Sequence, residues 1–211
     1  MSVEPLSRIA VVKLRNGNFG SVIRMLELAG AVGFLAEEPR ELTKSHAVII
    51  AGVGAFDSGM EDLENNGWVP VLNDLRTTGQ IPIMGICLGM QLLFESSEEG
   101  SRPGLNWLPG KVTKLKPNRE LKIRVPNMGW REIEIVRENP LLPVNSKHEF
   151  YFVHSFAVQE EEEIENTIMV SKHNPKFIAG VQKDRVFGVQ FHPKKSHAHG
   201  RELLANFVKS I

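Results

Sequence analysis

The sequence predicts an α/β fold, with a central, mainly parallel β-sheet flanked by helices and an additional antiparallel sheet. In the first half of the chain, short apolar runs alternate with segments whose apolar residues recur at helical spacing, which is the rhythm of successive strand–helix units. In the second half, polar and apolar residues alternate along several segments, as is typical of antiparallel strands. No repeat or evident linker divides the chain, so we expect one domain over residues 1–211.

The elements of the first half are predicted from the apolar runs and the segments between them. Buried strands are predicted at residues 8–14, 47–51 and 81–86. Helices are predicted at residues 21–31, at 59–77 with an interruption near Gly67, and at 89–95.

The second half predicts mostly strands. They are expected at residues 121–136, 150–158, 167–172, 177–182 and 186–191. Residues 182–185 (QKDR) predict a hairpin turn, and residues 200–211 an amphipathic closing helix. Residues 159–165 hold five glutamates, which favours a solvated loop.

Composition and charge exclude several classes of function. The chain has 25 Lys and Arg residues against 25 Asp and Glu residues, so no net charge draws it to nucleic acid or to an acidic membrane. No apolar run reaches the length of a membrane span, and the N-terminal residues lack the features of a signal peptide. The single cysteine can form no internal disulfide and no thiolate metal cluster, so we expect a reducing, cytoplasmic setting.

Cys87 lies in the most informative segment, IPIMGICLGMQLLF. Gly85-x-Cys87-x-Gly89 between a strand and a helix is the pattern of a nucleophile elbow, with sulfur in place of oxygen. A sharp turn crowds the nucleophile, so its flanking positions must lack side chains. The N-terminus of the helix is expected to lower the thiol pKa. Viewed alone, the segment also fits a buried core cysteine.

His192 is the best general-base candidate among the seven histidines. It follows the apolar run VFGVQF, and a cysteine nucleophile needs a base that takes the thiol proton and later protonates the leaving group. A lone histidine at a strand end is more often structural, so the role depends on its pairing with Cys87. His197 and His199 have no third ligand nearby in the sequence, so we expect no metal site and no cofactor.

The segment IIAGVGAF at residues 49–56 ends a predicted strand with two glycines. Such a turn can present backbone N–H groups to a tetrahedral oxyanion. A simple glycine turn that closes a strand fits the segment equally well. The glycines do not form GxGxxG, so they are no dinucleotide fingerprint.

Seven short motifs run in order along almost the whole chain: GNFGSV at 17–22, GVGAF at 52–56, GICLGMQ at 85–91, GLNW at 104–107, VPNMGW at 125–130, YFVHS at 151–155 and FHP at 191–193. Together they resemble class I glutamine amidotransferases. The elbow and the histidine strand resemble the class as a whole, whereas GVGAF, PNMGW and YFVHS resemble the glutaminase subunits of imidazole glycerol phosphate synthase. The resemblance implies the flavodoxin-like fold of that class.

The resemblance also implies roles for individual residues. Cys87 would attack the carboxamide of L-glutamine and form a γ-glutamyl thioester, and His192 would shuttle the proton. The oxyanion and the substrate would be bound by residues of three motifs: Gly52, Val53, Gly54, Leu88, Gln91 and Ser155.

A protein partner is implied in the same way. In this family the ammonia passes into a (β/α)₈-barrel subunit, which makes imidazole glycerol phosphate and an aminoimidazole carboxamide ribonucleotide in histidine biosynthesis. Asn18, Trp130 and Lys195 match positions that look toward that partner, so a heterodimer is expected.

One departure from the family concerns the catalytic histidine. The family continues its motif as His-Pro-Glu-Lys-Ser, but here residues 192–196 read HPKKS, so Lys194 stands at the position of the triad acid. Removing the acid of a serine-protease triad costs about 10⁴-fold in turnover, whereas cysteine sites tolerate the loss better because a thiol ionises more easily. If Lys194 points at His192, it lowers the histidine pKa and stabilises the thiolate. If it points to solvent, a Cys–His dyad remains.

Three functions fit these residues. The first is a working glutaminase that uses the dyad or borrows an acid elsewhere. The second is a paralogous subunit that supplies ammonia to another acceptor, such as a nucleotide sugar in surface-polysaccharide synthesis. The third is a catalytically weakened subunit, kept as a binding partner. The second stays open because KLR at residues 13–15 replaces Asp-Tyr-Gly and Ala51 replaces a proline of the family.

Overall fold

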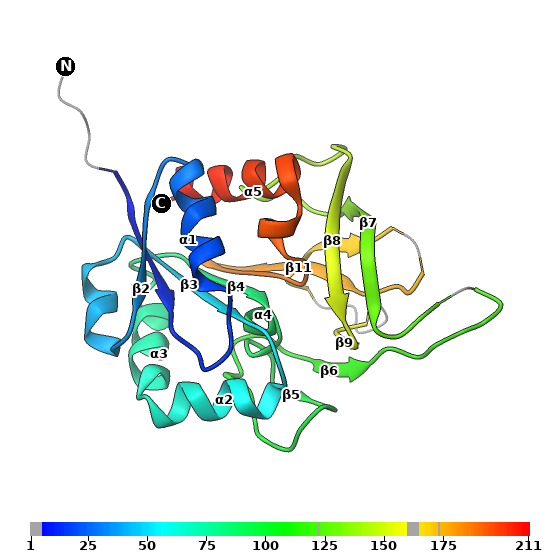
Figure 1. Cartoon of the computed structure of the whole chain (residues 1–211), viewed down its shortest axis with the longest axis horizontal. Coiled ribbons are helices and arrows are strands. Elements are labelled where there is room, and N and C mark those ends of the chain that lie inside the picture. The colour runs from blue at the N-terminus through cyan, green and yellow to red at the C-terminus, as the bar shows by residue number, and fades with distance from the viewer. Residues whose placement is uncertain (1–5, 122, 160–164, 173) are drawn as a thin grey trace.

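A nine-stranded sheet with the order β2-β1-β3-β4-β12-β11-β10-β7-β8 forms the centre of the fold (Figure 1). The computed structural model describes residues 6–121, 123–159, 165–172 and 174–211. The strands of this sheet are β1 (Arg8–Val12), β2 (Val32–Ala36), β3 (Ala47–Gly52), β4 (Ile83–Cys87), β7 (Asn127–Ile135), β8 (His148–His154), β10 (Thr167–Ser171), β11 (Ile178–Lys183) and β12 (Val186–Val189).

The sheet is parallel on one side and antiparallel on the other. Every pairing from β2 to β12 is parallel, and every pairing from β12 to β8 is antiparallel. The predicted antiparallel strands therefore continue the main sheet. A separate small sheet has the order β5-β6-β9, with strands β5 (Ser96–Ser97), β6 (Lys111–Lys114) and β9 (Phe156–Ala157). The predicted α/β fold class is confirmed.

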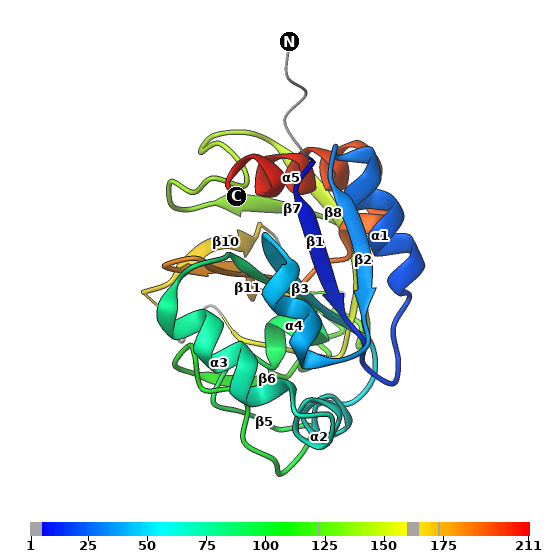
Figure 2. The ribbon, with the colours of Figure 1, turned by 90° about the vertical axis from the view of Figure 1, so that its left-hand side faces the viewer.

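Helices cover both faces of the parallel strands (Figures 1 and 2). They are α1 (Phe19–Leu28), α2 (Phe56–Asn65), α3 (Trp68–Thr78), α4 (Leu88–Gln91) and α5 (His197–Lys209), with 3₁₀ helices η1 (Pro39–Lys44) and η3 (Pro193–Lys195). Helices α1 and α5 contact each other over one face, and α2 contacts α3 and α4 over the other.

Alternation along the strands explains why there are two cores. Ile9 and Val11 of β1 pack in the cluster that holds residues of α1 and α5. Ala10 and Val12 pack in the opposite cluster, with residues of α2, α3 and α4. A strand whose successive side chains enter different cores has to be apolar throughout, which is the pattern from which this strand was predicted.

The predicted elements differ from the structure in a few places. Strand β2 was not predicted, and the helix after Cys87 is a single turn, Leu88–Gln91. The hairpin at residues 182–185 is confirmed by the pairing of Lys183 with Val186. Gly67 interrupts the predicted helix in a left-handed conformation, as expected. Most of the glutamate run, residues 160–164, lies outside the described residues. Within the described part, no helix is both long and apolar enough to span a bilayer.

Candidate active site

Cys87 ends β4 and directly precedes α4, so it stands at the strand-to-helix turn that the sequence predicts. Its backbone has φ 54° and ψ −109°, and residues other than glycine rarely adopt such a positive φ. Such a conformation persists only where the surrounding fold enforces it, and it is frequent at catalytic residues. The backbone therefore has the geometry of a nucleophile elbow.

The two glycines of the elbow are required by close backbone contacts. A Cβ atom on Gly89 would lie 1.8 Å from the carbonyl oxygen of Ile50 in β3, and one on Gly85 would lie 2.5 Å from the carbonyl oxygen of Gly89. Because both obstacles are backbone atoms, they cannot rotate away as a side chain could. This confirms the steric reason for which glycines were expected on either side of Cys87.

The thiol of Cys87 lies in a buried environment that keeps it protonated. Burial raises its pKa to about 11, although the Leu88 N–H group, the Lys194 cation and the Gln190 amide lower it. The prediction of a lowered thiol pKa is therefore wrong. Helix α4 has only four residues, so its positive end does not offset the cost of placing a thiolate in this site.

The backbone of His192 is held by three hydrogen bonds. Its N–H group donates to the carbonyl of Tyr151 over 3.0 Å, and its own carbonyl accepts from the Lys195 N–H and the Ser196 hydroxyl. The residue is 4% exposed, and the buried Nε2 atom of its ring has no hydrogen-bond partner among the described residues. Burial, followed by the charges of Lys194 and Lys195, lowers its pKa to about 4. The side chain is therefore a neutral base at physiological pH.

Lys194 is half-buried, and its charge acts on both Cys87 and His192. It lowers the pKa of His192 and also favours the thiolate of Cys87. These are the effects expected of a lysine that points toward the histidine. Burial lowers the pKa of the ammonium group itself. Within the described part of the chain, no carboxylate forms an ion pair or a side-chain hydrogen bond with His192, so no acid takes the place of the third triad member.

Cys87 and His192 both line one cleft. The cleft also contains most of the residues predicted to bind the oxyanion or the substrate: Val53, Gly54, Leu88, Gln91 and Ser155. A neighbouring cavity, also lined by His192, contains Gly52, Asn18 and Lys194. The structure thus brings the predicted site residues to one edge of the sheet, at the carboxyl ends of its parallel strands.

Val53 does not offer its N–H group to the cleft in this conformation. That group donates to the carbonyl of Asn16 over 3.2 Å, while Gly54 follows with φ 115°, a conformation open to glycine. The Leu88 N–H group, in contrast, already interacts with the Cys87 sulfur. In this conformation, the Leu88 N–H group therefore bonds the cysteine sulfur, and the Val53 N–H group bonds a backbone carbonyl.

Gln91 is fixed in a buried chain of amides that leads to the nucleophile. Its Nε2 atom donates to the Phe156 carbonyl over 2.9 Å and to the Gln190 Oε1 atom over 3.1 Å. The Gln190 Nε2 atom in turn donates to the Cys87 sulfur over 3.7 Å. Both N–H bonds of Gln91 are used in this way, so its Oε1 atom is the group left for a ligand.

Sequence reasoning missed Gln190, Glu99 and His154. Gln190 is a buried amide inside an otherwise apolar run, and that polarity was a signal for it. Glu99 lines the cleft and accepts from the Phe56 N–H group over 2.9 Å, but it lies in a polar segment without a distinguishing pattern. His154 also lines the cleft, where burial lowers its pKa to about 4.

The residues expected to face a protein partner lie in different settings. Trp130 is 38% exposed and stacks on His197, with ring centroids 5.4 Å apart. The Lys195 ammonium lies 5.0 Å from the centroid of Tyr151, whose ring also contacts Trp130 edge-on. Trp130 and Lys195 therefore belong to one cluster. The Asn18 side chain instead caps α1 by accepting from Ser21.

Comparison with known proteins agrees with this geometry. A family described as class-I glutamine amidotransferase matches residues 35–211. Imidazole glycerol phosphate synthase subunit HisH 1 of Campylobacter jejuni is 39% identical over 203 residues, covering 95% of this chain and 99% of that protein. Subunit HisH 2 of Methanococcus maripaludis is 40% identical over 204 residues, covering 95% and 98%.

Subunit HisH 2 of Pseudomonas aeruginosa is 37% identical over 204 residues, covering 96% of this chain and all of that protein. Among solved structures, PurLQS from Thermotoga maritima shares the fold with a TM-score of 0.74 at 18% identity, covering 98% of this chain and 99% of that one. The resemblance that the seven motifs indicate is thereby confirmed: the chain belongs to the class I glutamine amidotransferase family.

Proposed function

We propose that this chain is the glutaminase subunit of an imidazole glycerol phosphate synthase and releases ammonia from L-glutamine. The observation that carries the proposal is the placement of Cys87, on a strained elbow, in the same cleft as the neutral base His192. Relatives that bear the name of this subunit are similar over nearly their whole length, which supports the choice of this subunit within the family.

The reaction divides into two steps through a covalent intermediate. His192 takes the proton of the Cys87 thiol as the sulfur attacks the carboxamide carbon of glutamine, and the carbonyl oxygen becomes an oxyanion. The C–N bond then breaks while the imidazolium returns its proton to the leaving nitrogen, which departs as ammonia. Water, deprotonated by His192, hydrolyses the γ-glutamyl thioester, so glutamate leaves and the thiol is restored.

One of the proposed oxyanion donors has to change its hydrogen-bond partner before it can act. The Leu88 N–H group lies at the sulfur, whereas the Val53 N–H group must leave the carbonyl of Asn16 before it can serve an oxyanion. One missing donor costs about 10²- to 10³-fold in turnover in the best-studied case. Gly52 and Gly54 flank Val53, and their freedom permits the required rotation of the peptide.

Charge complementarity orients the substrate in the cleft. Free glutamine carries an α-ammonium group, and Glu99 is the carboxylate that lines the cleft. One carboxylate oxygen of Glu99 accepts a hydrogen bond from the Phe56 N–H group, which holds the side chain at the start of α2. The free Oε1 atom of Gln91 and the backbone around Ser155 provide neutral partners for the rest of the substrate. Glu99 therefore joins the residues to which we assign substrate binding.

The position and exposure of a group of side chains support the proposed partner surface. Trp130 and Met128 are exposed at 38% and 56%, and the cluster of Trp130, Tyr151, His197 and Lys195 lies beside the backbone bonds that hold His192. A (β/α)₈-barrel subunit docked there would receive the ammonia. The residues at 13–15, Ala51 and Lys194 also fit a paralogous subunit that serves a nucleotide sugar, so the acceptor has to be tested.

The test measures glutamine hydrolysis by the full chain, alone and with a barrel subunit and its ribonucleotide substrate. We expect the barrel and its substrate to stimulate hydrolysis, and Cys87→Ala to lower it by about 10⁴-fold or more. The same variant should still support synthesis from added ammonium salts, because the barrel alone uses the ammonia.

Equal hydrolysis by the wild type and Cys87→Ala would overturn the enzymatic assignment. A second result would change the acceptor of the ammonia. If hydrolysis depends on Cys87 but a nucleotide sugar is amidated and no imidazole glycerol phosphate forms, the chain is the paralogous subunit.

A further inference from the structure

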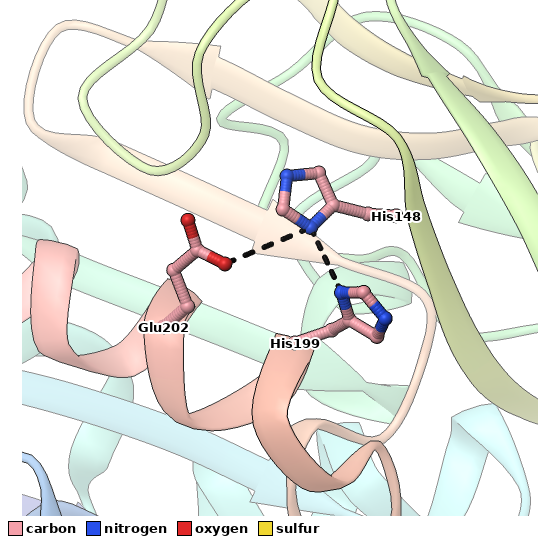
Figure 3. A group of neighbouring side chains, drawn as sticks. All are labelled: His148, His199 and Glu202. Carbon is pink, nitrogen blue, oxygen red and sulfur yellow. Dashed lines mark hydrogen bonds and ion pairs between the residues drawn. The ribbon is translucent and has the colours of Figure 1, made fainter.

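His148, His199 and Glu202 form a cluster away from the cleft, at the junction of β8 and α5 (Figure 3). His148 is the first residue of β8, and the other two stand three residues apart on one face of α5. One imidazole nitrogen from each histidine and one carboxylate oxygen all lie within 4.8 Å of one another. None of the three residues has a part in the chemistry of Cys87.

We propose that this cluster binds a Zn²⁺ ion or a similar first-row divalent transition-metal ion. Two imidazoles and one carboxylate are a donor set that zinc prefers, whereas magnesium and calcium prefer oxygen alone. Three protein ligands leave the fourth tetrahedral position to water.

The distances between the donor atoms suit a small tetrahedral ion. With Zn–N bonds of about 2.0–2.1 Å, tetrahedral ligand atoms stand roughly 3.3 Å apart. The two Nδ1 atoms of the histidines lie 3.1 Å apart, and the His148 Nδ1 atom lies 3.9 Å from the Glu202 carboxylate. All three donor atoms lie within 4.8 Å of one another, so a movement of the exposed Glu202 side chain toward the two histidines completes the site.

A second hydrogen bond fixes which nitrogen of His148 is free to bind. The single hydrogen of the Ser146 hydroxyl is donated to the carbonyl of Pro143, so this hydroxyl can only accept from the His148 Nε2 atom, 2.8 Å away. The proton of the ring is therefore on Nε2, and the lone pair of Nδ1 faces His199 and Glu202. Metal-binding histidines are typically oriented by such a bond from the opposite nitrogen.

The protonation states and the access to solvent also suit a metal ion. The Nδ1 atom of His148 accepts in this hydrogen-bond network, so its lone pair is available, as that of a metal ligand must be. His199 donates its Nδ1 proton to His148 in the metal-free state and would carry that proton on Nε2 when metal is bound, with no net loss. Glu202 is exposed and His199 half-buried, so an ion can enter from solvent.

Sequence reasoning excluded a metal site because His197 and His199 have no third ligand nearby in the chain. The structure separates these two neighbours: His197 stacks on Trp130, whereas His199 meets His148, 51 positions away. His197 is thus a matched control for the experiment, since it is a histidine of the same helix outside the cluster.

The test titrates the metal-free, untagged full chain with Zn²⁺ by calorimetry. Cys87→Ala serves as the parent for every variant, so that the Cys87–His192 pair cannot bind the ion. We expect one Zn²⁺ per chain, a higher melting temperature with zinc, and the visible spectrum of tetrahedral Co²⁺ on substitution. His199→Gln should weaken binding more than about 10-fold, Ser146→Ala by about 10-fold, and His197→Gln not at all.

Two results would overturn the site. One is the absence of zinc binding to the folded parent, and the other is equal affinity in the parent, His199→Gln and Glu202→Gln. Because His199 and Glu202 are at least partly exposed, these variants should fold like the parent, and circular dichroism checks that they do.

Discussion

Lys194 acts on Cys87 and His192, the proposed nucleophile and base, through its positive charge. An acid at this position would stabilise the imidazolium that forms when His192 takes the thiol proton, whereas the lysine opposes that charge. It also lowers the free energy of the thiolate, but burial still keeps the Cys87 pKa at about 11. The lysine thus favours one half of the proton transfer and opposes the other. Because of this balance, we expect the lysine to slow the proton transfer without abolishing it.

We predict that Lys194→Glu raises glutamine turnover with the partner present by on the order of 10-fold. A nearby carboxylate favours imidazolium and therefore raises the pKa of His192 from about 4. Because the neutral imidazole is the base, the acidic limb of the kcat/KM profile should move to higher pH by about one unit or more.

Lys194→Met is the matched control, because it removes the cation without adding an acid. The methionine variant should shift the acidic limb upward by less and should not recover turnover. If both variants keep the profile of the wild type, Lys194 does not act on His192 and its charge is directed to solvent.

At the scale of elements, the elbow stores its strain in tight contact between β4, α4 and β3. Gly89 lies so close to Ile50 that a methyl group would meet a carbonyl oxygen at 1.8 Å. We predict that Gly89→Ala lowers the free energy of unfolding by about 3 kcal/mol, since only a shift of backbone could relieve the contact. Urea unfolding of the purified variant measures this loss.

Gly20 provides the control for the elbow prediction. It lies in α1, and a Cβ atom there would have no heavy atom within 4 Å. Gly20→Ala should leave the stability unchanged or raise it by up to about 1 kcal/mol, since alanine loses less entropy in a helix. Equal urea midpoints for Gly89→Ala and the wild type would show that the elbow is not close-packed.

Some elements could be predicted from the chain alone and others could not. The elbow was predictable because the sharp turn around Cys87 leaves no room for side chains at the flanking positions, which are therefore glycines. Strand β2 was not, because Gly33 interrupts it and its side chains are mostly only half-buried, which leaves little periodicity. The direction of the Cys87 pKa shift depends on burial by residues that are far away in the sequence. A local sequence pattern therefore does not predict it.

At the scale of the whole molecule, one strand pairing creates the active site. Strand β12 pairs parallel with β4, with Val189 opposite Ile86. The carboxyl ends of parallel strands lie at the same edge of a sheet, where α/β proteins bind their ligands. Cys87 and His192 therefore both lie at this edge and line the same cleft. The sequence predicted an antiparallel hairpin for residues 186–191, and the pairing of β12 with β11 confirms it. The parallel pairing of β12 with β4 could not be predicted, because the two strands are far apart in the sequence.

The same packing predicts how stability depends on pH. His154 and His192 are buried as neutral rings, and the pKa of each falls from 6.5 to about 4. Below pH 6.5 the unfolded chain takes up protons that the folded chain refuses, so stability is fully present above that pH and falls as pH drops toward 4. Each ring can contribute up to about 3 kcal/mol of this loss.

Urea midpoints between about pH 7 and about pH 4 measure the loss. His154 bonds to the Phe156 carbonyl through Nδ1, and in His154→Asn the amide can make that bond without titrating. We expect this variant to lose markedly less stability than the wild type over the interval, whatever its stability at neutral pH. His46→Gln, at an exposed position, should retain the full dependence. Parallel curves for His154→Asn and the wild type would mean that His154 is protonated in the folded protein at no cost.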